Sequence, residues 1–186
     1  MFQIRIHGRG GQGVVTAAEM LSIAAFEEGK HAQAIPSFGS ERMGAPVVAY
    51  VRIDDEPIEL TEPVMRPDLL IIQDATLFHA VDVFAGLADE GFVLINSARE
   101  LPELHIDDAL AKLPEHHVCT VAATELALRH IGRATPNTAL LGALTALTEV
   151  LHLDSVITAV NHKFSGEVAE RNIAVARAAH DDAHAA

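Results

Sequence analysis

Cysteine and tryptophan are almost missing from this chain of 186 residues, which has one cysteine, Cys119, and no tryptophan. A single thiol excludes an intramolecular disulfide, and it cannot supply the usual set of thiolates of an iron–sulfur cluster. Cys119 lies in the apolar run Val118–Val121. We therefore interpret it as a small buried hydrophobic residue rather than a nucleophile.

Basic residues are also scarce, since 13 lysines and arginines stand against 26 acidic residues and give a formal net charge of −13. That charge repels nucleic acid phosphates and anionic membrane surfaces, so we expect no nucleic acid partner. No stretch approaches the roughly 20 apolar residues of a membrane span, and the N-terminus has no basic region followed by a hydrophobic signal core. The sequence therefore predicts a cytoplasmic protein without a membrane span.

The remaining composition is that of an ordinary globular protein, with 49% hydrophobic and 21% charged residues. A chain of this length can bury a full core within one domain. We expect residues 1–186 to form a single domain, in which the Ala/His/Asp segment 180–186 is a frayed tail.

A glycine-rich segment follows the apolar alternation Phe2–Ile6 and runs directly into the helical pattern Val14–Glu28. Its residues, which we call the glycine loop, are Gly8, Arg9, Gly10, Gly11, Gln12 and Gly13. A strand, a glycine turn and a helix in this order bring backbone N–H groups and the positive end of a helix to one point, which favours a phosphate. The spacing also matches the G-x-G-x-x-G pattern of dinucleotide-binding folds. The alternative is a tight turn that needs glycine only for positive φ angles.

Beyond this loop, apolar patterns alternate between strands and helices. The apolar run inside Asp68–Asp74 is typical of a strand buried on both faces. Further strands are expected at His31–Ile35, Val47–Ile53, Ile58–Leu60, Gly91–Ile95 and His117–Val121, with 54–57 joining the second and third of these as a hairpin. Further helices are expected at Leu77–Leu87, Asp107–Leu113, Ala123–Ile131, Thr138–Leu151, Ser155–Phe164 and Glu167–Ala179. The predicted fold is α/β: a Rossmann-like, mainly parallel sheet with helices on both faces, a β-hairpin insertion and a helical C-terminal portion.

A nicotinamide dinucleotide site needs an acidic residue about 20 positions beyond the glycines, at the end of the second strand. That region reads Gln33–Ser37 and has no carboxylate, so this ligand is disfavoured while the capacity for phosphate remains. The segment 36–46, which we call the second loop, is too long for a simple turn, and its composition indicates a binding loop. Arg9 and Arg42 are the candidate cations, with solvated surface charge as the alternative.

Other catalytic patterns are missing. The sequence has no G-x-S-x-G elbow, no H-E-x-x-H pair and no P-loop lysine after the glycines. Its eleven histidines lack paired ligand spacing, so we expect no metal site. Asp74 ends a buried strand, where it could face a ligand, but we favour a capping contact with Thr76. Asn96 and Ser97 end the next strand and could line the same crevice.

With these motifs in order, the chain resembles the gamma subunit, or gamma domain, of the 2-oxoacid:ferredoxin oxidoreductases, a family that includes pyruvate:ferredoxin oxidoreductase (pyruvate synthase). The resemblance covers nearly the full chain. The matching segments are Gly8–Gly13, Pro36–Val47, Arg52–Ile58, Pro67–Asp74, Asn96–Ser97, Pro136–Ala143 and Ala169–Asn172.

The resemblance implies a subunit of an enzyme that converts a 2-oxoacid and coenzyme A to an acyl-CoA and CO2, with electrons passed to ferredoxin or another acceptor. It implies alpha, beta and delta-type partner subunits, which hold the thiamine diphosphate, Mg and iron–sulfur clusters. The gamma part is associated with coenzyme A and with holding the complex together. No residue of this chain is expected to make or break a bond, so it would assist catalysis by positioning.

We therefore expect coenzyme A phosphates to meet the glycine loop, with added contacts from the second loop. The expected binding residues are Gly8, Arg9, Gly10, Gly11, Gln12, Gly13, Ser40 and Arg42. The resemblance leads us to expect a second arginine after Arg42, but Met43 stands there, which argues against a paired-arginine grip on a phosphate. The alternatives are a purely structural interaction subunit without a ligand site and a free-standing nucleotide-binding oxidoreductase, which the missing carboxylate disfavours.

Overall fold

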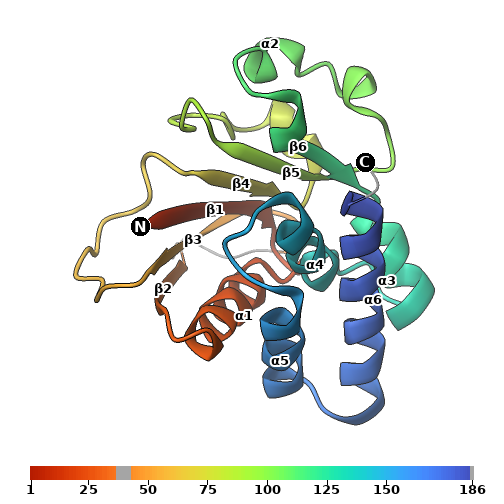
Figure 1. The fold of residues 1–186 in the computed structure, drawn as a ribbon. Coiled ribbons are helices and arrows are strands. Elements are labelled where there is room, and N and C mark those ends of the chain that lie inside the picture. The colour runs from red at the N-terminus through yellow and green to blue at the C-terminus, as the bar shows by residue number, and fades with distance from the viewer. Residues whose placement is uncertain (37–42, 185–186) are drawn as a thin grey trace.

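A mixed sheet forms the centre of the protein (Figure 1). The computed structural model describes residues 1–36 and 43–184, and within them the sheet has the strand order β2-β3-β1-β4-β5-β6. The strands are β1 (Phe2–Arg9), β2 (His31–Pro36), β3 (Pro46–Asp54), β4 (Leu69–Ile72), β5 (Phe92–Asn96) and β6 (Val118–Val121). The adjacent strands β1, β4, β5 and β6 are parallel to one another, whereas β3 is antiparallel to both β1 and β2.

Long α-helices pack against one face of this sheet and short helices against the other (Figure 1). Side chains alternate between faces along a strand, so in β4 Leu69 and Ile71 join the core under the long helices while Leu70 and Ile72 join the opposite core. This explains the continuous apolar run and confirms the prediction of helices on both faces. The long helices are α1 (Val14–Glu27), α3 (Ala123–Ile131), α4 (Asn137–Leu147), α5 (Leu153–Lys163) and α6 (Gly166–His184). The short ones are α2 (Asp107–Leu110) and the 3-10 turns η1 (Ala75–His79), η2 (Leu101–Leu104) and η3 (Glu115–His117).

Helix α4 is the central helix of the C-terminal portion. Every residue from Asn137 to Leu144 is buried, as expected for a helix that is apolar on all sides and enclosed by other elements. Its tightest neighbour is α6, because any side chain at Gly142 would meet the Ala176 backbone. A buried hydrogen bond from Thr138 Oγ1 to Asn172 Oδ1, 2.9 Å long, fixes the register of the two helices.

The prediction of an antiparallel strand pair that includes Val47–Ile53 is right, but the strand predicted to pair with this segment is wrong. Strands β2 and β3 form the antiparallel pair, with Ala34 opposite Val51, and the second strand expected at Ile58–Leu60 does not form. Strand β3 already pairs with β1 on one side and β2 on the other. No edge of β3 is therefore left for the segment after Pro57.

Two helix predictions also need correction. The helix expected at Leu77–Leu87 is only the turn η1, which ends at His79. A helix could not have continued to Leu87, because Gly86 has a left-handed φ of 74° and lies close to the Met65 carbonyl. The tail expected to fray continues α6 through His184, since Ala183 packs on the core and His180 Nδ1 lies 2.9 Å from Thr145 Oγ1. Residues 185–186 lie outside the described part. In that part of the chain, every helix is too short or too polar to span a lipid bilayer.

Glu28 joins the end of α1 to the beginning of α5. Its Oε1 accepts hydrogen bonds from the His152 backbone N–H at 2.7 Å and from the Ser155 hydroxyl, and its Oε2 accepts one from Lys30 Nζ at 3.0 Å. Burial by itself would raise the pKa of this carboxyl, but the bonds from His152, Ser155 and Lys30 outweigh it and lower the pKa to about 2. The carboxylate therefore stabilises the folded state only while it is ionised.

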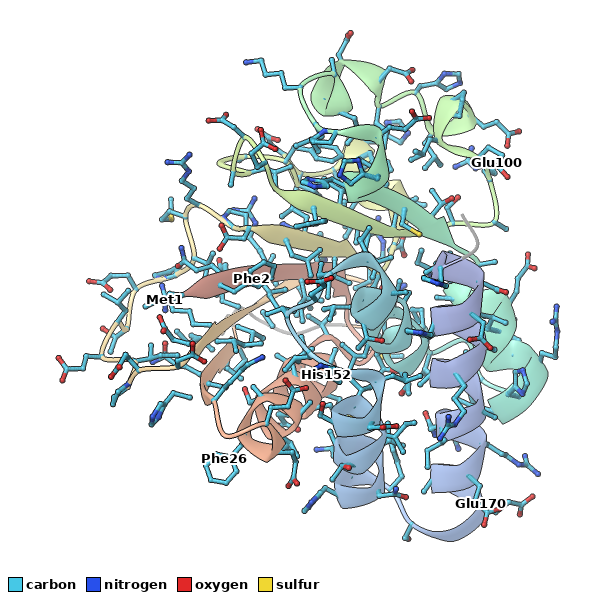
Figure 2. All side chains as sticks on the ribbon, viewed as in Figure 1. Met1, Phe2, Phe26, Glu100, His152 and Glu170 are labelled. Carbon is cyan, nitrogen blue, oxygen red and sulfur yellow. The ribbon has the colours of Figure 1, made fainter. Side chains whose placement is uncertain are left out.

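Glu28→Gln is expected to lower the free energy of unfolding by about 2 kcal/mol at neutral pH, because it weakens charge-assisted hydrogen bonds. The folded-state pKa is depressed, so the contribution of Glu28 is fully present above its ordinary value of 4.5 and is lost as the pH falls towards about 2. The free energies of unfolding of the wild type and the variant, measured with urea, should therefore converge over that pH interval. The control is Glu170→Gln, on the outer side of α6 (Figure 2). If the difference in free energy of unfolding between the wild type and Glu28→Gln does not narrow below pH 4.5, the stabilising role of the Glu28 carboxylate is contradicted.

Candidate functional site

The glycine loop connects β1 to α1 and depends on glycine for its shape. Gly11 and Gly13 have left-handed φ angles of 93° and 77°, which favour glycine because it has no Cβ. Gly8 is required for packing, since a Cβ there would lie 2.5 Å from Val14 Cγ2. The tight-turn requirement is thus real at these positions. Whether the loop can also hold an anion depends on its hydrogen-bond donors.

The backbone N–H groups in the first half of the loop already have acceptors within the protein. The Arg9 N–H donates to Gln12 Oε1 at 2.7 Å, and the Gly10 N–H donates to the Ala45 carbonyl at 2.9 Å. The second half differs: among residues 1–36 and 43–184, the N–H groups of Gly11 and Gly13 have no acceptor. The first N–H groups of α1 also have no intrahelical acceptor, as at any helix start. The donors available to a ligand are therefore the N–H groups of Gly11, Gly13 and the first turn of α1, whereas the Gln12 N–H donates to the Arg9 carbonyl at 3.1 Å.

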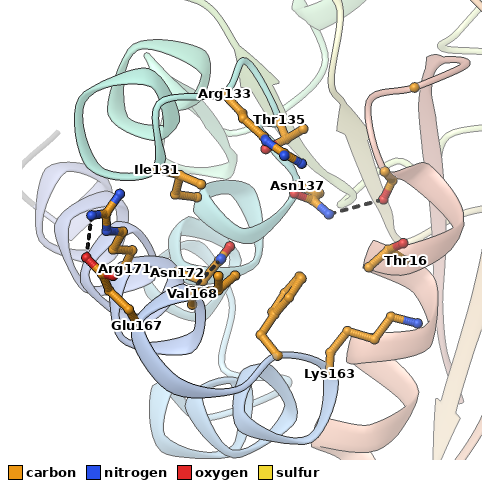
Figure 3. A pocket seen from close by; sticks show the side chains of 13 residues that line it. Thr16, Ile131, Arg133, Thr135, Asn137, Lys163, Glu167, Val168, Arg171 and Asn172 are labelled. Atoms are coloured by element: carbon orange, nitrogen blue, oxygen red, sulfur yellow. Dashed lines mark hydrogen bonds and ion pairs between the residues drawn. The ribbon is translucent and has the colours of Figure 1, made fainter.

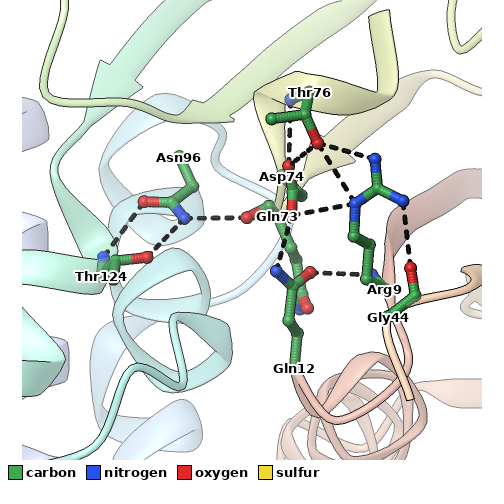
Figure 4. A network of polar contacts seen from close by, with 8 residues as sticks. All are labelled: Arg9, Gln12, Gly44, Gln73, Asp74, Thr76, Asn96 and Thr124. Carbon is green, nitrogen blue, oxygen red and sulfur yellow. Dashed lines mark hydrogen bonds and ion pairs between the residues drawn. The ribbon is translucent and has the colours of Figure 1, made fainter. Parts of the chain in front are cut away.

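A polar network holds the loop in place (Figure 4). Asp74 Oδ2 accepts a hydrogen bond from Gln12 Nε2 at 2.9 Å and lies 3.3 Å from Arg9 Nε. Arg9 also donates from Nη2 to Thr76 Oγ1 at 2.7 Å and from Nη1 to the Gly44 carbonyl at 3.0 Å. Arg9 is thus engaged in joining the glycine loop to the second loop and to η1, rather than directed at a ligand.

Asp74 caps η1 as the sequence predicted, because its Oδ1 accepts from the Thr76 N–H at 3.0 Å. The sequence did not reveal its second role, as the anchor of Gln12 and Arg9. Burial would raise the pKa of Asp74, but the bonds from Thr76 and Gln12 and the charge of Arg9 lower it. The carboxylate therefore remains ionised at neutral pH and can keep the network intact.

Asn96 has a comparable structural use at the next strand end. Its Nδ2 donates to the Gln73 carbonyl and to Thr124 Oγ1, both at 2.8 Å, and its Oδ1 accepts from the Thr124 N–H at 3.1 Å (Figure 4). Asn96 and Ser97 line a hollow of about 340 Å³ that does not include the glycine loop. Asp74 does not line this hollow either, so the prediction that Asn96 and Ser97 line one crevice with Asp74 is not met.

A larger cavity of about 470 Å³ opens beside the second half of the glycine loop, and we call it the loop-side cavity (Figure 3). Its walls come from the loop and α1, the α3–α4 connection, and the junction of α5 with α6. The lining residues are Gly11, Gly13, Thr16, Ile131, Arg133, Thr135, Asn137, Lys163, Phe164, Glu167, Val168, Arg171 and Asn172. Sequence reasoning gave no role to any of these outside the glycine loop, although the matched segments Pro136–Ala143 and Ala169–Asn172 contain several of them.

The second loop can be compared with expectation only in part. Ser40 and Arg42 fall outside the described residues. Met43 is described and pairs with Gly10 through a β-bridge. It is 87% exposed, and a carbon added to Gly11 would lie 3.0 Å from its sulfur. An apolar side chain thus covers the outer side of the loop where the resemblance led us to expect a cation.

Metal and thiol chemistry find little support in the described ranges. Residues 1–36 and 43–184 contain no group of three or more His, Cys, Asp and Glu side chains placed to hold a metal ion. Cys119 is 5% exposed, and burial raises the pKa of its thiol to about 11. It stays protonated at neutral pH, which confirms its interpretation as a small buried hydrophobic residue.

Known proteins share this sequence and fold. A family model described as pyruvate ferredoxin/flavodoxin oxidoreductase matches residues 3–181. The chain is 45% identical over 181 residues to the pyruvate/ketoisovalerate oxidoreductases common subunit gamma of Pyrococcus furiosus, which covers 97% of this chain and 96% of that one. The crystal structure of pyruvate oxidoreductase subunit PORC from Thermotoga maritima superposes with a TM-score of 0.81 at 35% identity, covering 97% of this chain and 95% of the other.

A more distant structure shares the fold alone. The 2-oxoglutarate:ferredoxin oxidoreductase of Magnetococcus marinus, solved with 2-oxoglutarate, coenzyme A and succinyl-CoA bound, matches with a TM-score of 0.75 at 18% identity. The match covers the whole of this chain and 31% of the Magnetococcus chain. The family match and the near-complete coverage by gamma subunits confirm the resemblance read from the motifs. The chain belongs to the pyruvate ferredoxin/flavodoxin oxidoreductase family and is a gamma subunit of a pyruvate/2-oxoacid ferredoxin oxidoreductase.

Proposed function

We propose that this subunit binds part of coenzyme A at the glycine loop, within a cytoplasmic complex that converts a 2-oxoacid and coenzyme A to an acyl-CoA and CO2. The observation that carries the proposal is the set of N–H donors without acceptors in the described chain, those of Gly11, Gly13 and the first turn of α1, beside the loop-side cavity that Gly11, Gly13 and Thr16 line. Such donors at the positive end of a helix favour phosphate.

The chemistry of coenzyme A fits this arrangement. It carries a diphosphate and a 3′-phosphate, so it needs hydrogen-bond donors and cations but not the ribose-binding carboxylate that the Gln33–Ser37 segment lacks. Coenzyme A is also among the ligands of the Magnetococcus enzyme. The role of this chain would be to hold and orient the thiol substrate, which lowers the entropic barrier to its reaction.

The remaining cofactors are assigned to partners. Cys119 is single, buried and protonated, so it cannot supply cluster ligands. We assign the thiamine diphosphate with its Mg, which supplies the decarboxylation chemistry, and the iron–sulfur clusters to alpha, beta and delta-type subunits. Electrons would leave that complex to ferredoxin or another acceptor.

Arg42→Ala tests the contribution of the second loop. The variant is expected to raise the apparent KM for coenzyme A about tenfold in the reconstituted complex, because it removes a cation from a phosphate. The KM for the 2-oxoacid should change little. Arg177→Ala, an exposed arginine on α6, is the matched control, and an unchanged coenzyme A dependence in Arg42→Ala would remove this residue from the site.

The alternative function, a purely structural interaction subunit, draws on exposed apolar side chains. Phe26 is 76% exposed and Met65 is 75% exposed, and such side chains suit contacts with partner subunits. The two functions differ in what a change to the glycine loop disrupts. A ligand site loses coenzyme A dependence with the complex intact, whereas a structural role loses assembly.

A further inference from the structure

We propose that the loop-side cavity is an anion-binding subsite for a phosphate ester and that Arg133 is its ligand-facing cation. The inference rests on the proposed function, because it takes the ligand to be the one held by the glycine loop. It adds the part of the site that the loop does not supply. On this view the ligand extends from the loop towards the C-terminal helices, away from Met43.

The cavity lies where several helices begin. The first turn of α1, the first residue of α4 and the first turn of α6 all contribute lining residues, among them Thr16, Asn137 and Val168 (Figure 3). Helix N-termini carry partial positive charge. Ile131 and Lys163, the last residues of α3 and α5, also line the cavity and bring the opposite partial charge. Three helix starts against two helix ends still favour an anion, even though the chain has a formal charge of −13.

The cavity is lined by three cations, Arg133, Lys163 and Arg171, and by one carboxylate, Glu167. Lys163 lies 2.5 Å from Glu19 Oε2, and Arg171 forms an ion pair with Glu167 on the preceding turn of α6. Arg133 has no acidic partner in the described portion of the chain. An arginine is suited to phosphate because its fork of N–H donors matches the oxygens.

Asn137 connects this cation to the glycine loop. It is 7% exposed and lines the cavity, and its Nδ2 approaches the Gly13 carbonyl only to 3.4 Å (Figure 3), beyond the usual N–H···O range. Its Oδ1 has no donor among the described residues. The amide therefore keeps hydrogen-bonding capacity for a ligand in the cavity that it lines, and its side chain lies against Gly13 of the loop.

The apolar wall narrows the ligand class. Ile131, Phe164 and Val168 line the same cavity, so one side offers hydrophobic contact while Arg133 and the helix starts offer charge. The 640 Å³ hollow beside β6 is larger but is lined by Glu100 and Glu115, which repel an anion. We therefore assign the loop-side cavity to a phosphorylated ligand with an apolar or aromatic portion, such as coenzyme A.

The test is Arg133→Gln in the assembled complex, with coenzyme A as the probe. We expect the apparent KM for coenzyme A to rise about tenfold, with the KM for the 2-oxoacid unchanged and with partial recovery in Arg133→Lys. Arg129→Gln is the matched control, since Arg129 is exposed on α3 and does not line the cavity.

The outcomes separate this inference from the proposed function. If a substitution at Gly13 raises the KM for coenzyme A and Arg133→Gln does not, the loop binds the ligand and the cavity does not. If neither substitution changes it, both proposals fail. If Arg133→Gln raises both KM values equally, or prevents assembly, Arg133 is structural and the subsite is overturned.

Discussion

Gly142→Ala is expected to destabilise the subunit by about 3 kcal/mol or more, although it adds a single methyl group. A Cβ at this position would lie 2.0 Å from the Ala176 carbonyl oxygen and 2.7 Å from the Ala176 carbonyl carbon and Cα. The colliding atoms belong to the backbone of α6, so α4 and α6 must separate, and overpacking of this kind is strongly destabilising. Chemical denaturation of the full chain, followed by far-ultraviolet circular dichroism, would measure the loss.

The sign of the stability change in Gly142→Ala distinguishes close packing of α4 against α6 from an open helix surface. In an unobstructed helix interior, glycine to alanine stabilises by about 1 kcal/mol, so a stabilised Gly142→Ala would show that α4 and α6 are not in close contact. A companion variant, Ala176→Gly, removes a methyl group but no backbone atom. It should therefore fail to rescue Gly142→Ala, and rescue would place the collision elsewhere.

The sequence predicted those parts of the fold that depend on local pattern. The apolar run in Asp68–Asp74 identified β4, and the step from Ile6 through glycine to Val14 identified the β1–α1 turn. It failed for the partners of β3, because pairing joins segments distant in the chain: β3 lies between β1 and β2. Once both sides of β3 are occupied, the segment at Ile58–Leu60 cannot pair with β3, whatever its local pattern favours.

The candidate site divides in the same way. The sequence motif revealed the glycine loop but not which of its hydrogen-bond donors are already used. The Arg9 guanidinium, for example, donates to Thr76 and to the Gly44 carbonyl. Arg133 carries no local signal, because the cavity forms only when the α3–α4 connection meets α1 and α6. The late segments that carried the resemblance were the available clue: they meet in space where Thr138 bonds to Asn172.

Gly13→Ala is expected to raise the apparent KM for coenzyme A at least tenfold in the assembled complex while leaving the KM for the 2-oxoacid nearly unchanged. Gly13 has a φ of 77°, and a Cβ there would lie 2.5 Å from Asn137 Nδ2. A left-handed conformation costs a non-glycine residue roughly 1–2 kcal/mol. The loop can relieve that strain only by turning its peptide planes or by displacing Asn137. Either change redirects the N–H donors that face the loop-side cavity. Steady-state kinetics with each substrate varied in turn would measure the split.

Gly29→Ala separates the effect on the site from the strain itself. Gly29 has a φ of 74°, close to that of Gly13, but nothing lies within 4 Å of a carbon added to it. The control should therefore lose a similar amount of stability from strain while its coenzyme A dependence stays that of the wild type. If Gly13→Ala instead yields a folded chain that no longer joins its partner subunits, the loop is an assembly element and the ligand assignment is wrong. If the complex forms and its coenzyme A dependence matches that of Gly29→Ala, the second half of the loop does not contact the ligand.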